Sequence, residues 1–169
     1  MLSIRDNILY FNPDIEEKNE NETINIYDCL EKFREEEILE KENKYYCERC
    51  KSHQNAKKKI QIYKPPLYLI VQLKRFKYSN SLLSKLIDDT KIETFVHIPD
   101  TLDLKEYVYG PDKNNSQYEI YGNILHIENH YLANCKNDGL WIIYNDDSLH
   151  KVSFPQIENS YLLFYKRKN

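Results

Sequence analysis

The chain has 169 residues and a formal net charge of −3, with 41% hydrophobic and 30% charged residues. This length suits one domain, which would bury about 70% of its unfolded surface on folding. The even charge balance argues against nucleic acid and against an anionic membrane as the main partner, because both favour a clustered basic excess. No segment reaches the roughly 18 apolar residues of a membrane span, and the N-terminus lacks the apolar core of a signal peptide. We therefore expect an intracellular protein, in the cytoplasm or nucleus.

The N-terminal third alternates between apolar and acidic segments. The sequence contains 15 Tyr and 6 Phe, which favour a sheet-rich fold. Residues Ile8–Phe11 are predicted to form a strand that ends at Asn12-Pro13, and the acidic residues 14–23 are predicted to form an exposed loop.

A helix is predicted next. Apolar residues recur at helical spacing from Ile26 to about residue 38, and either Thr23 or Asn25 is suited to cap the N-terminus of the helix. Cys29 falls on the apolar stripe of this helix and is expected to be a small buried side chain.

The remaining two thirds of the chain are dominated by predicted strands. Residues Leu67–Leu73 form a continuous apolar run, which is typical of a strand buried on both faces and places this strand at the centre of the sheet. Further strands are predicted at 56–63, 92–99, 118–126, 130–135, 141–145 and 161–165, the last closing the sheet, with a polar turn at Ser79–Ser84 and a loop at Gly110–Ser116.

Cys47 and Cys50 stand two residues apart, a spacing at which two thiolates can bind one tetrahedral zinc ion. A structural zinc needs four ligands, and only His53 is a further candidate nearby. Three alternatives stay open: zinc bound by this chain alone, zinc completed by residues outside it, or a metal-free turn. The following run Lys57-Lys58-Lys59 is interpreted as the wet face of a strand, with attraction of an acidic partner as the alternative.

Two neighbouring predicted strands carry residues suited to nucleophilic catalysis. His130 begins one strand, and Asn145-Asp146 ends the other. A histidine that faces a short amide or carboxylate is half of a nucleophilic site, and the other half is a cysteine or serine whose proton the histidine takes. Cys135 lies five residues beyond His130, which is about 16 Å along a strand and on the opposite face. Cys135 is therefore excluded as the partner of His130.

The residues His130-Tyr-Leu-Ala-Asn-Cys-Lys-Asn137 and Gly139-Leu-Trp-Ile-Ile-Tyr-Asn-Asp-Asp-Ser148 resemble the histidine box of the ubiquitin-specific proteases, papain-like cysteine proteases that remove ubiquitin. Other segments match that family in the same order along nearly the whole chain, namely Tyr27–Glu37, Tyr46–Lys58, Pro65–Phe76 and Tyr161–Tyr165. The resemblance implies an α+β fold. Its palm is a mostly antiparallel sheet at about 64–169, with few helices and a finger-like β extension carrying a zinc knuckle at about 1–63.

The resemblance also implies roles for individual residues. His130 would be the general base, Asn145 the third member of the catalytic site, and Asp146 a supporting acid. Three residues, Phe76, His126 and Tyr131, match positions beside the cleft for the ubiquitin tail. Cys47 and Cys50 match one of the two zinc-binding pairs of the family.

Three departures from the family pattern shape the expected function. The N-terminal box with the nucleophilic cysteine is absent, as is the first zinc-binding pair. Residues 1–169 thus resemble the C-terminal part of the catalytic domain, a papain-like half-domain. Between the two histidines stands only Ile127-Glu128-Asn129, without the glycines usual in the family, which affects how the ubiquitin tail threads the cleft.

We therefore expect a thiol-dependent deubiquitinase of which this chain supplies the His/Asn half, inactive by itself and without a catalytic cofactor. Its expected partners are ubiquitin or a ubiquitinated protein and the missing N-terminal half. The alternative is an inactive relative that binds ubiquitin or acts as a scaffold. The absent nucleophile favours the alternative, whereas the presence of both His130 and Asn145 favours the enzyme.

Overall fold

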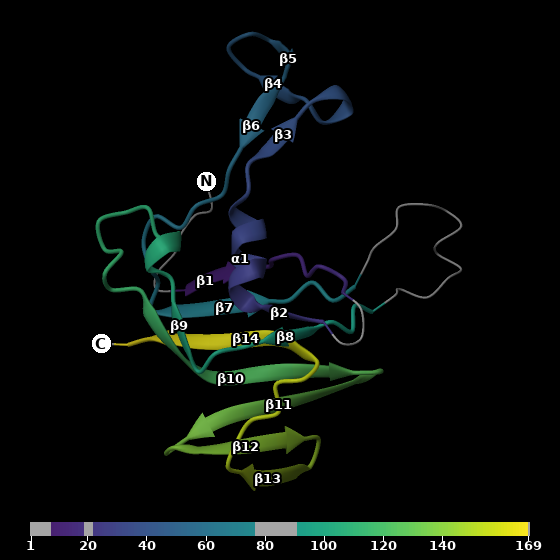
Figure 1. Cartoon of the computed structure of the whole chain (residues 1–169), viewed down its shortest axis with the longest axis vertical. Helices are drawn as coiled ribbons and strands as arrows, with labels where there is room; N and C mark the ends of the chain where they lie inside the picture. The colour runs from purple at the N-terminus through teal and green to yellow at the C-terminus, as the bar shows by residue number, and fades with distance from the viewer. Residues whose placement is uncertain (1–7, 19–21, 77–90, 169) are drawn as a thin grey trace.

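A computed structural model describes residues 8–18, 22–76 and 91–168 of the chain (Figure 1). The predicted turn at Ser79–Ser84 lies outside the described residues. The main sheet has eight strands. In spatial order they are β1 (Ile8–Phe11), β7 (Tyr68–Gln72), β14 (Ser160–Arg167), β10 (Gln117–Ile127), β11 (His130–Asn137), β12 (Leu140–Asn145) and β13 (Ser148–Val152), with β9 (Thr101–Asp103) paired to β10. All neighbours are antiparallel except β1 and β7, so the expectation of a mostly antiparallel α+β fold is confirmed.

The main sheet has two unlike faces. One, here called the core face, carries buried side chains in alternation along β7 and β14: Leu69, Val71, Leu163 and Tyr165. The other, here called the outer face, carries their half-buried neighbours: Tyr68, Ile70, Leu162 and Phe164. Alternation follows from the two-residue period of a strand, which sends successive side chains to opposite faces.

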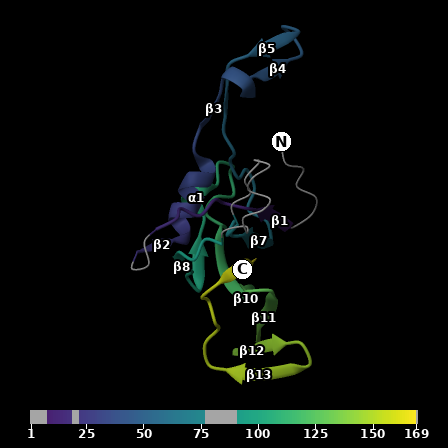
Figure 2. The same cartoon turned by 90° about the vertical axis from the view of Figure 1, so that its right-hand side faces the viewer.

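Helix α1 (Ile26–Arg34) lies against the core face (Figure 2). Asn25 caps it: the Asn25 side chain accepts from the Tyr27 amide, and the Asp28 side chain accepts from the Asn25 amide. Of the two predicted caps, Asn25 is therefore correct. Cys29 is buried, as predicted.

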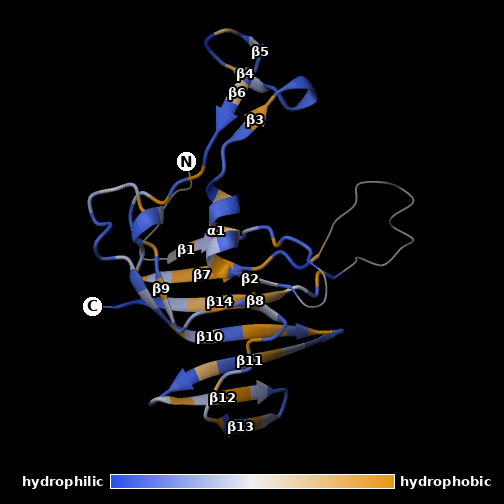
Figure 3. Cartoon of the chain, in the orientation of Figure 1, coloured by the Kyte–Doolittle hydropathy of each residue, from blue (hydrophilic) through white to orange (hydrophobic). Residues whose placement is uncertain are grey.

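The helix ends four residues earlier than predicted because the next residues leave it to form an arm. Two hairpins build this arm, which rises from the body in Figure 1. They are β3 (Glu37–Leu39) with β6 (Ala56–Lys58), and β4 (Tyr45–Cys47) with β5 (Ser52–Gln54), with a 3-10 turn η1 (Lys41–Asn43) between them. None of residues 35–58 is buried, and Figure 3 shows the arm as mostly hydrophilic. The strand predicted at 56–63 stops at Lys58, where the arm rejoins the body.

Two predictions about the sheet order are wrong. Strand β7 is next to the edge strand β1 rather than central, and its residues alternate between buried and half-buried. Strand β14, predicted to close the sheet, lies between β7 and β10. The hydrophobicity of a strand therefore indicates how much of its surface other elements bury, and does not indicate its position in the sheet.

Short elements complete the body. They are β2 (Thr23–Asn25), which pairs in parallel with β8 (Phe95–His97), and a 3-10 turn η3 (Lys105–Tyr107). The strand predicted at 92–99 is thus shortened to three residues. Residues 19–21 of the loop predicted at 14–23 lie outside the described residues; of the others, Ile15 is buried in the core and Thr23 begins β2. In the described part of the chain, no helix is long and apolar enough to cross a bilayer.

Candidate active site

His130 is positioned by the tight hairpin between β10 and β11. Ile127 pairs with His130, so only Glu128 and Asn129 form the turn. Glu128 adopts φ 51°, a left-handed conformation that glycine adopts more readily than a side-chain-bearing residue. The connection between the two histidines is therefore as short as the sequence predicted, and it is built without glycine.

Asn145 reaches His130 diagonally across two neighbouring strands. Ala133 pairs with Tyr144, so extending the antiparallel register by one residue sets Leu132 opposite Asn145. His130 lies two residues from Leu132 and hence on the same, core, face. Its Nε2 lies 2.6 Å from Asn145 Oδ1. The structure thus brings together these two predicted site residues.

Asp146 is the next residue of the chain and makes a looser approach. Its Oδ2 lies 4.0 Å from His130 Nε2, and its side chain is 80% exposed. Asp146 occupies the turn between β12 and β13 with φ 48°. The Asp146 carboxylate therefore adds negative potential near the imidazole but does not fix the orientation of the ring. The contact with Asn145 fixes that orientation.

The contact with Asn145 selects the chemistry of the imidazole. The amide oxygen Oδ1 only accepts, so Nε2 of His130 carries the hydrogen and donates it. In the neutral ring, Nδ1 is then the basic nitrogen. Nothing in the described chain bonds to Nδ1, and the side chain of His130 is 45% exposed. Nδ1 of the imidazole is thus left facing solvent, available to accept a proton.

None of the four cysteines of the chain is placed to be its nucleophile. Cys29 is buried in the core, and burial together with Asp28 raises its thiol pKa to about 11. Cys47 and Cys50 lie in the arm. Cys135 pairs with Gly122 in β11 and faces the outer side, five residues from His130. The exclusion of Cys135 made from the sequence agrees with this geometry.

The three residues predicted to line the cleft for the ubiquitin tail, Phe76, His126 and Tyr131, form one aromatic cluster. The His126 ring stacks on Tyr131 with centroids 4.4 Å apart and meets Phe76 edge-on at 5.1 Å. A fourth ring, Tyr161, lies 6.1 to 6.4 Å from the other three. Tyr131 follows His130 directly in β11, so its side chain points to the opposite, outer face. The aromatic cluster therefore lies on the outer face, at the same end of β11 as His130.

Tyr161 was missed from the sequence for a definable reason. Simple alternation along β14 would send it to the core face with Leu163. A bulge intervenes: Leu162 pairs with Ile124 whereas Ser160 pairs with Leu125, so Tyr161 is the extra residue. Such a bulge re-aims a side chain, here toward the outer face. In the sequence, Tyr161 stood out only as the first residue of the predicted strand Tyr161–Tyr165.

His126 lies in a partly buried environment beside a lysine. Partial burial and the nearby Lys91 ammonium lower the pKa of His126 below its ordinary value. Its Nδ1 is buried and has no hydrogen-bond partner within the described segments. His126 is thus held neutral near pH 7, as an aromatic wall with one unused polar atom.

A buried polar network supports β11 from behind. Asn134 Nδ2 donates to Asn123 Oδ1 at 2.9 Å, and Asn123 Nδ2 donates to Ser160 Oγ at 2.9 Å. Both amide groups also donate to the Gln156 carbonyl, in the segment between β13 and β14. The network joins β10, β11 and β14 with that segment on the core face. No sequence pattern predicts this network, because an asparagine in a strand is equally compatible with an exposed position.

Arg75 fixes the strand ends beside the aromatic cluster. It is 2% exposed and donates to the carbonyls of Ser160, Ile92 and Thr94 at 2.7, 3.0 and 3.0 Å. Burial lowers its pKa, although arginine stays charged. An open groove of about 620 Å³ adjoins it. Its lining consists of Asn12, Asp14, Ile15, Gln72, Lys74, Arg75, Phe76, Ile92 and Tyr161.

Cys47 and Cys50 occupy the turn of the β4–β5 hairpin at the tip of the arm. The Cys50 amide donates to Cys47 Sγ at 3.5 Å, and this bond, with the Cys50 thiol and the Arg49 amide, lowers the thiol pKa of Cys47. His53 instead directs Nδ1 toward the Lys44 carbonyl. Across the residues that the structure describes, no group of three or more side chains could hold a metal. The donors present are half of the tetrahedral set that a structural zinc takes, and alone they do not fit the ion.

Comparisons with known proteins bear on the whole of this arrangement. The sequence model of the family described as ubiquitin carboxyl-terminal hydrolase matches residues 10–165. Ubiquitin carboxyl-terminal hydrolase 9 of Arabidopsis thaliana is 36% identical over 159 residues, covering 89% of this chain and 17% of that protein. Human ubiquitin carboxyl-terminal hydrolase 15 is 34% identical over 159 residues, covering 86% of this chain and 15% of that protein.

The solved structures similar to this chain include the SAGA Ubp8/Sgf11/Sus1/Sgf73 DUB module bound to ubiquitin aldehyde. It superposes with a TM-score of 0.68 at 31% identity, covering 94% of this chain and 35% of that chain. A structure of the yeast SAGA DUB module gives a TM-score of 0.69 at 30% identity. The chain spans about a sixth of the curated relatives and about a third of the solved chains. The match of the family model over residues 10–165 shows that the chain belongs to the ubiquitin carboxyl-terminal hydrolase family.

Proposed function

We propose that this chain is the histidine-bearing part of a thiol-dependent deubiquitinase, which hydrolyses the isopeptide bond between the ubiquitin C-terminus and a lysine. The observation that carries the proposal is the 2.6 Å contact from His130 Nε2 to Asn145 Oδ1, because it leaves Nδ1 as a base. Membership of the family supports this role. A similar solved structure holds ubiquitin aldehyde, which supports ubiquitin as the partner.

The reaction is acyl transfer through a thioester. His130 Nδ1 takes the proton of a thiol, and the thiolate attacks the carbonyl carbon of the ubiquitin C-terminus. The imidazolium, held by Asn145 Oδ1 and favoured by the Asp146 carboxylate, then protonates the departing lysine amine. Water attacks the thioester and gives its proton to Nδ1, which releases the carboxylate of ubiquitin and regenerates the thiol.

The aromatic cluster is suited to hold the ubiquitin tail. Phe76, His126, Tyr131 and Tyr161 present ring faces and edges beside the catalytic end of β11. Flat rings leave room for a narrow extended chain and exclude bulky side chains, which suits a tail that ends in glycine. The tight turn at Glu128 keeps the His126 and Tyr131 rings directly paired.

The thiol would come from the rest of the catalytic domain, since no cysteine of this chain contacts His130. The solved relatives are about three times as long as the matched region, so most of their residues lie outside it. Such residues would have to approach His130 at the end of β11, where its side chain is 45% exposed and the aromatic cluster lies on the adjoining outer face. We further propose that Cys47 and Cys50 bind zinc together with two ligands from outside this chain.

A complementation experiment tests the proposal. The chain is mixed with a separately produced N-terminal catalytic segment of a related protease, and hydrolysis of a fluorogenic ubiquitin C-terminal amide is followed. His130→Ala is expected to lower kcat by about a thousandfold, as loss of a general base does. Asn145→Ala is expected to cost about a hundredfold at unchanged KM, because orientation of the base is lost. His150→Ala, at an exposed histidine on β13, is the matched control.

A second candidate function is ubiquitin binding without catalysis. The observation that favours it is that none of the four cysteines contacts His130. Complementation without turnover, together with ubiquitin binding that His130→Ala leaves unchanged, would select this function. Turnover that survives His130→Ala would refute the proposed role of the histidine.

A further inference from the structure

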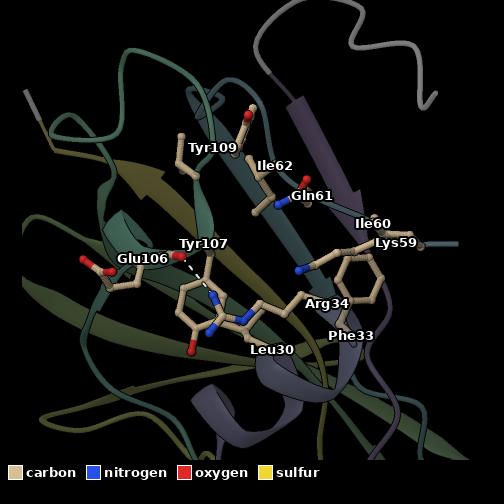
Figure 4. Close-up of a pocket in the computed structure, with 11 residues that line it drawn as sticks. Leu30, Phe33, Arg34, Lys59, Ile60, Gln61, Ile62, Glu106, Tyr107 and Tyr109 are labelled. Atoms are coloured by element: carbon tan, nitrogen blue, oxygen red, sulfur yellow. Dashed lines mark hydrogen bonds between the residues drawn. The ribbon is translucent and has the colours of Figure 1, made fainter. Parts of the chain in front are cut away.

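A second hollow lies on the body at the base of the arm, and it shares no residue with the candidate active site (Figure 4). Helix α1 forms one wall, and the segments 59–62 and 106–109 form the others. Its lining consists of Leu30, Phe33, Arg34, Lys59, Ile60, Gln61, Ile62, Glu106, Tyr107, Val108 and Tyr109. Its apolar lining includes Leu30, Phe33 and Ile62, and its lining also includes two cations, Arg34 and Lys59.

The walls of this hollow are fixed by backbone contacts. Ile62 and Val108 form a parallel bridge, and the Tyr109 amide donates to the Ile62 carbonyl at 2.8 Å. Gly110 comes so close that an added Cβ would lie 2.0 Å from the Tyr63 carbonyl oxygen. The shape of the hollow is therefore set before any ligand arrives.

One cation, Arg34, is already engaged. Its Nε donates to Glu31 Oε2 at 2.6 Å, its Nη1 donates to the Glu106 carbonyl at 2.9 Å, and its guanidinium lies 4.9 Å from the centre of the Tyr107 ring. Tyr107 in turn donates its hydroxyl to Glu31 at 3.0 Å. The positive charge of Arg34 is thus compensated by Glu31, and little of it remains available to a ligand.

The other cation, Lys59, differs from its neighbours in its charge partners within the described residues. Its neighbours Lys57 and Lys58 pair with Glu36 and Glu37 on the arm at 2.6 and 2.9 Å. For Lys59, the third lysine of the run, the described residues provide no such partner, and Figure 4 shows its side chain extending toward the middle of the hollow. The Glu106 side chain points away from the hollow in the same view. Among the residues that the structure describes, the Lys59 ammonium therefore has no anionic partner and lies beside an apolar lining.

We propose that this hollow is a docking site for a peptide segment of a partner protein, in which an aspartate or glutamate adjoins a leucine or phenylalanine. The carboxylate would pair with Lys59, and the apolar side chain would rest on Phe33 and Ile62. A free inorganic anion does not use the apolar lining, and a purely apolar segment leaves the ammonium without a partner. The site acts independently of the proposed chemistry at His130.

The test uses the 169-residue chain and three capped tripeptides, acetyl-Leu-Phe-Asp-amide, acetyl-Leu-Phe-Asn-amide and acetyl-Leu-Phe-Lys-amide. Each is titrated into the isotope-labelled chain while its amide resonances are recorded. The acidic probe is expected to shift the resonances of Ile60, Ile62 and Val108 and to bind about tenfold tighter than the amide probe. Lys59→Glu should remove this preference and should favour acetyl-Leu-Phe-Lys-amide instead.

Lys58→Glu is the matched control, since it changes the adjacent charge outside the hollow and should leave the affinity within about twofold. Equal weakening by Lys58→Glu and Lys59→Glu would show unspecific attraction and overturn the proposal. Shifts that avoid the hollow, or a hollow already filled by a second copy as shown by a concentration-dependent dimer, would overturn it as well.

Discussion

The two regions that carry functional residues are built in opposite ways. At the end of β11, the hydrogen-bonded pair His130 and Asn145 stands on a sheet that is backed by a buried polar network and by Arg75. The arm that carries Cys47 and Cys50 contains no buried residue, and its hairpins are braced by exposed ion pairs. Chemistry at an imidazole needs a fixed direction, so its support lies in the core. The arm has no comparable buried support.

Replacing Arg75 should break the support of the sheet most severely. Arg75→Met strands three buried carbonyl acceptors, and we expect a loss of about 4 kcal/mol in the free energy of unfolding, because each unsatisfied group costs roughly 1 to 3 kcal/mol. Urea denaturation measures it. Lys74→Met, at the exposed neighbour, is the control and should change stability by less than about 0.5 kcal/mol. A loss no larger than that of the control would show that these bonds are dispensable.

The buried amide network should come second. Asn123→Leu removes the donor to Ser160 and the acceptor of Asn134, with an expected loss of about 2 kcal/mol. The same substitution at the exposed Asn137, near the end of β11, should be nearly neutral. Equal effects at the two positions, measured by thermal unfolding, would mean that the network does not support β11.

A smaller effect is expected from pH, through His126. Its pKa in the folded chain lies below the ordinary value of 6.5, so the unfolded chain binds the proton more readily. The stability contributed by neutral His126 is therefore present above about pH 6.5 and is lost as pH falls through the folded pKa. The midpoint of urea denaturation should therefore be lower at the lower pH. Urea midpoints at about pH 7.5 and about pH 5.5 measure it, and His126→Gln should reduce the difference; an unchanged difference would assign it to other groups.

The arm should respond least. Glu36→Gln removes the partner that raises the pKa of Lys57, yet both groups are exposed and their attraction is screened by solvent. We expect the urea midpoint to stay within the error of the measurement. A shift comparable to that of Asn123→Leu would mean that the arm is coupled to the core and would erase the contrast between the two regions.

Local patterns in the sequence predicted much of this structure. The cap at Asn25, the buried position of Cys29, and the neighbouring strands that hold His130 and Asn145 all depend on residues close in the chain or on strand alternation. Such signals are local, so a single sequence contains them. The aromatic cluster of Phe76, His126 and Tyr131 came instead from a family resemblance.

Long-range features were not predictable in the same way. The bulge that turns Tyr161 outward depends on the partner strand β10, and the acceptors of Arg75 lie 17 to 85 residues away in sequence. The order of strands in the sheet also escaped prediction, because β7 is apolar through cover by α1 and not through a central position. The roles proposed for His130, Asn145 and Asp146, and zinc at Cys47 and Cys50, stay predictions until tested.

The position of β14 has a consequence for how the chain reaches its native state. This strand lies between β7 and β10, and its residues pair with β7 partners that stand 90 to 98 positions earlier in the sequence. Before residues 160–167 have been synthesised, the sheet is two separate pieces with open edges on both sides of a missing strand. Long-range pairings of this kind form slowly, and open edges invite association with other chains. Nascent chains should therefore depend on chaperones until β14 inserts and joins the two pieces.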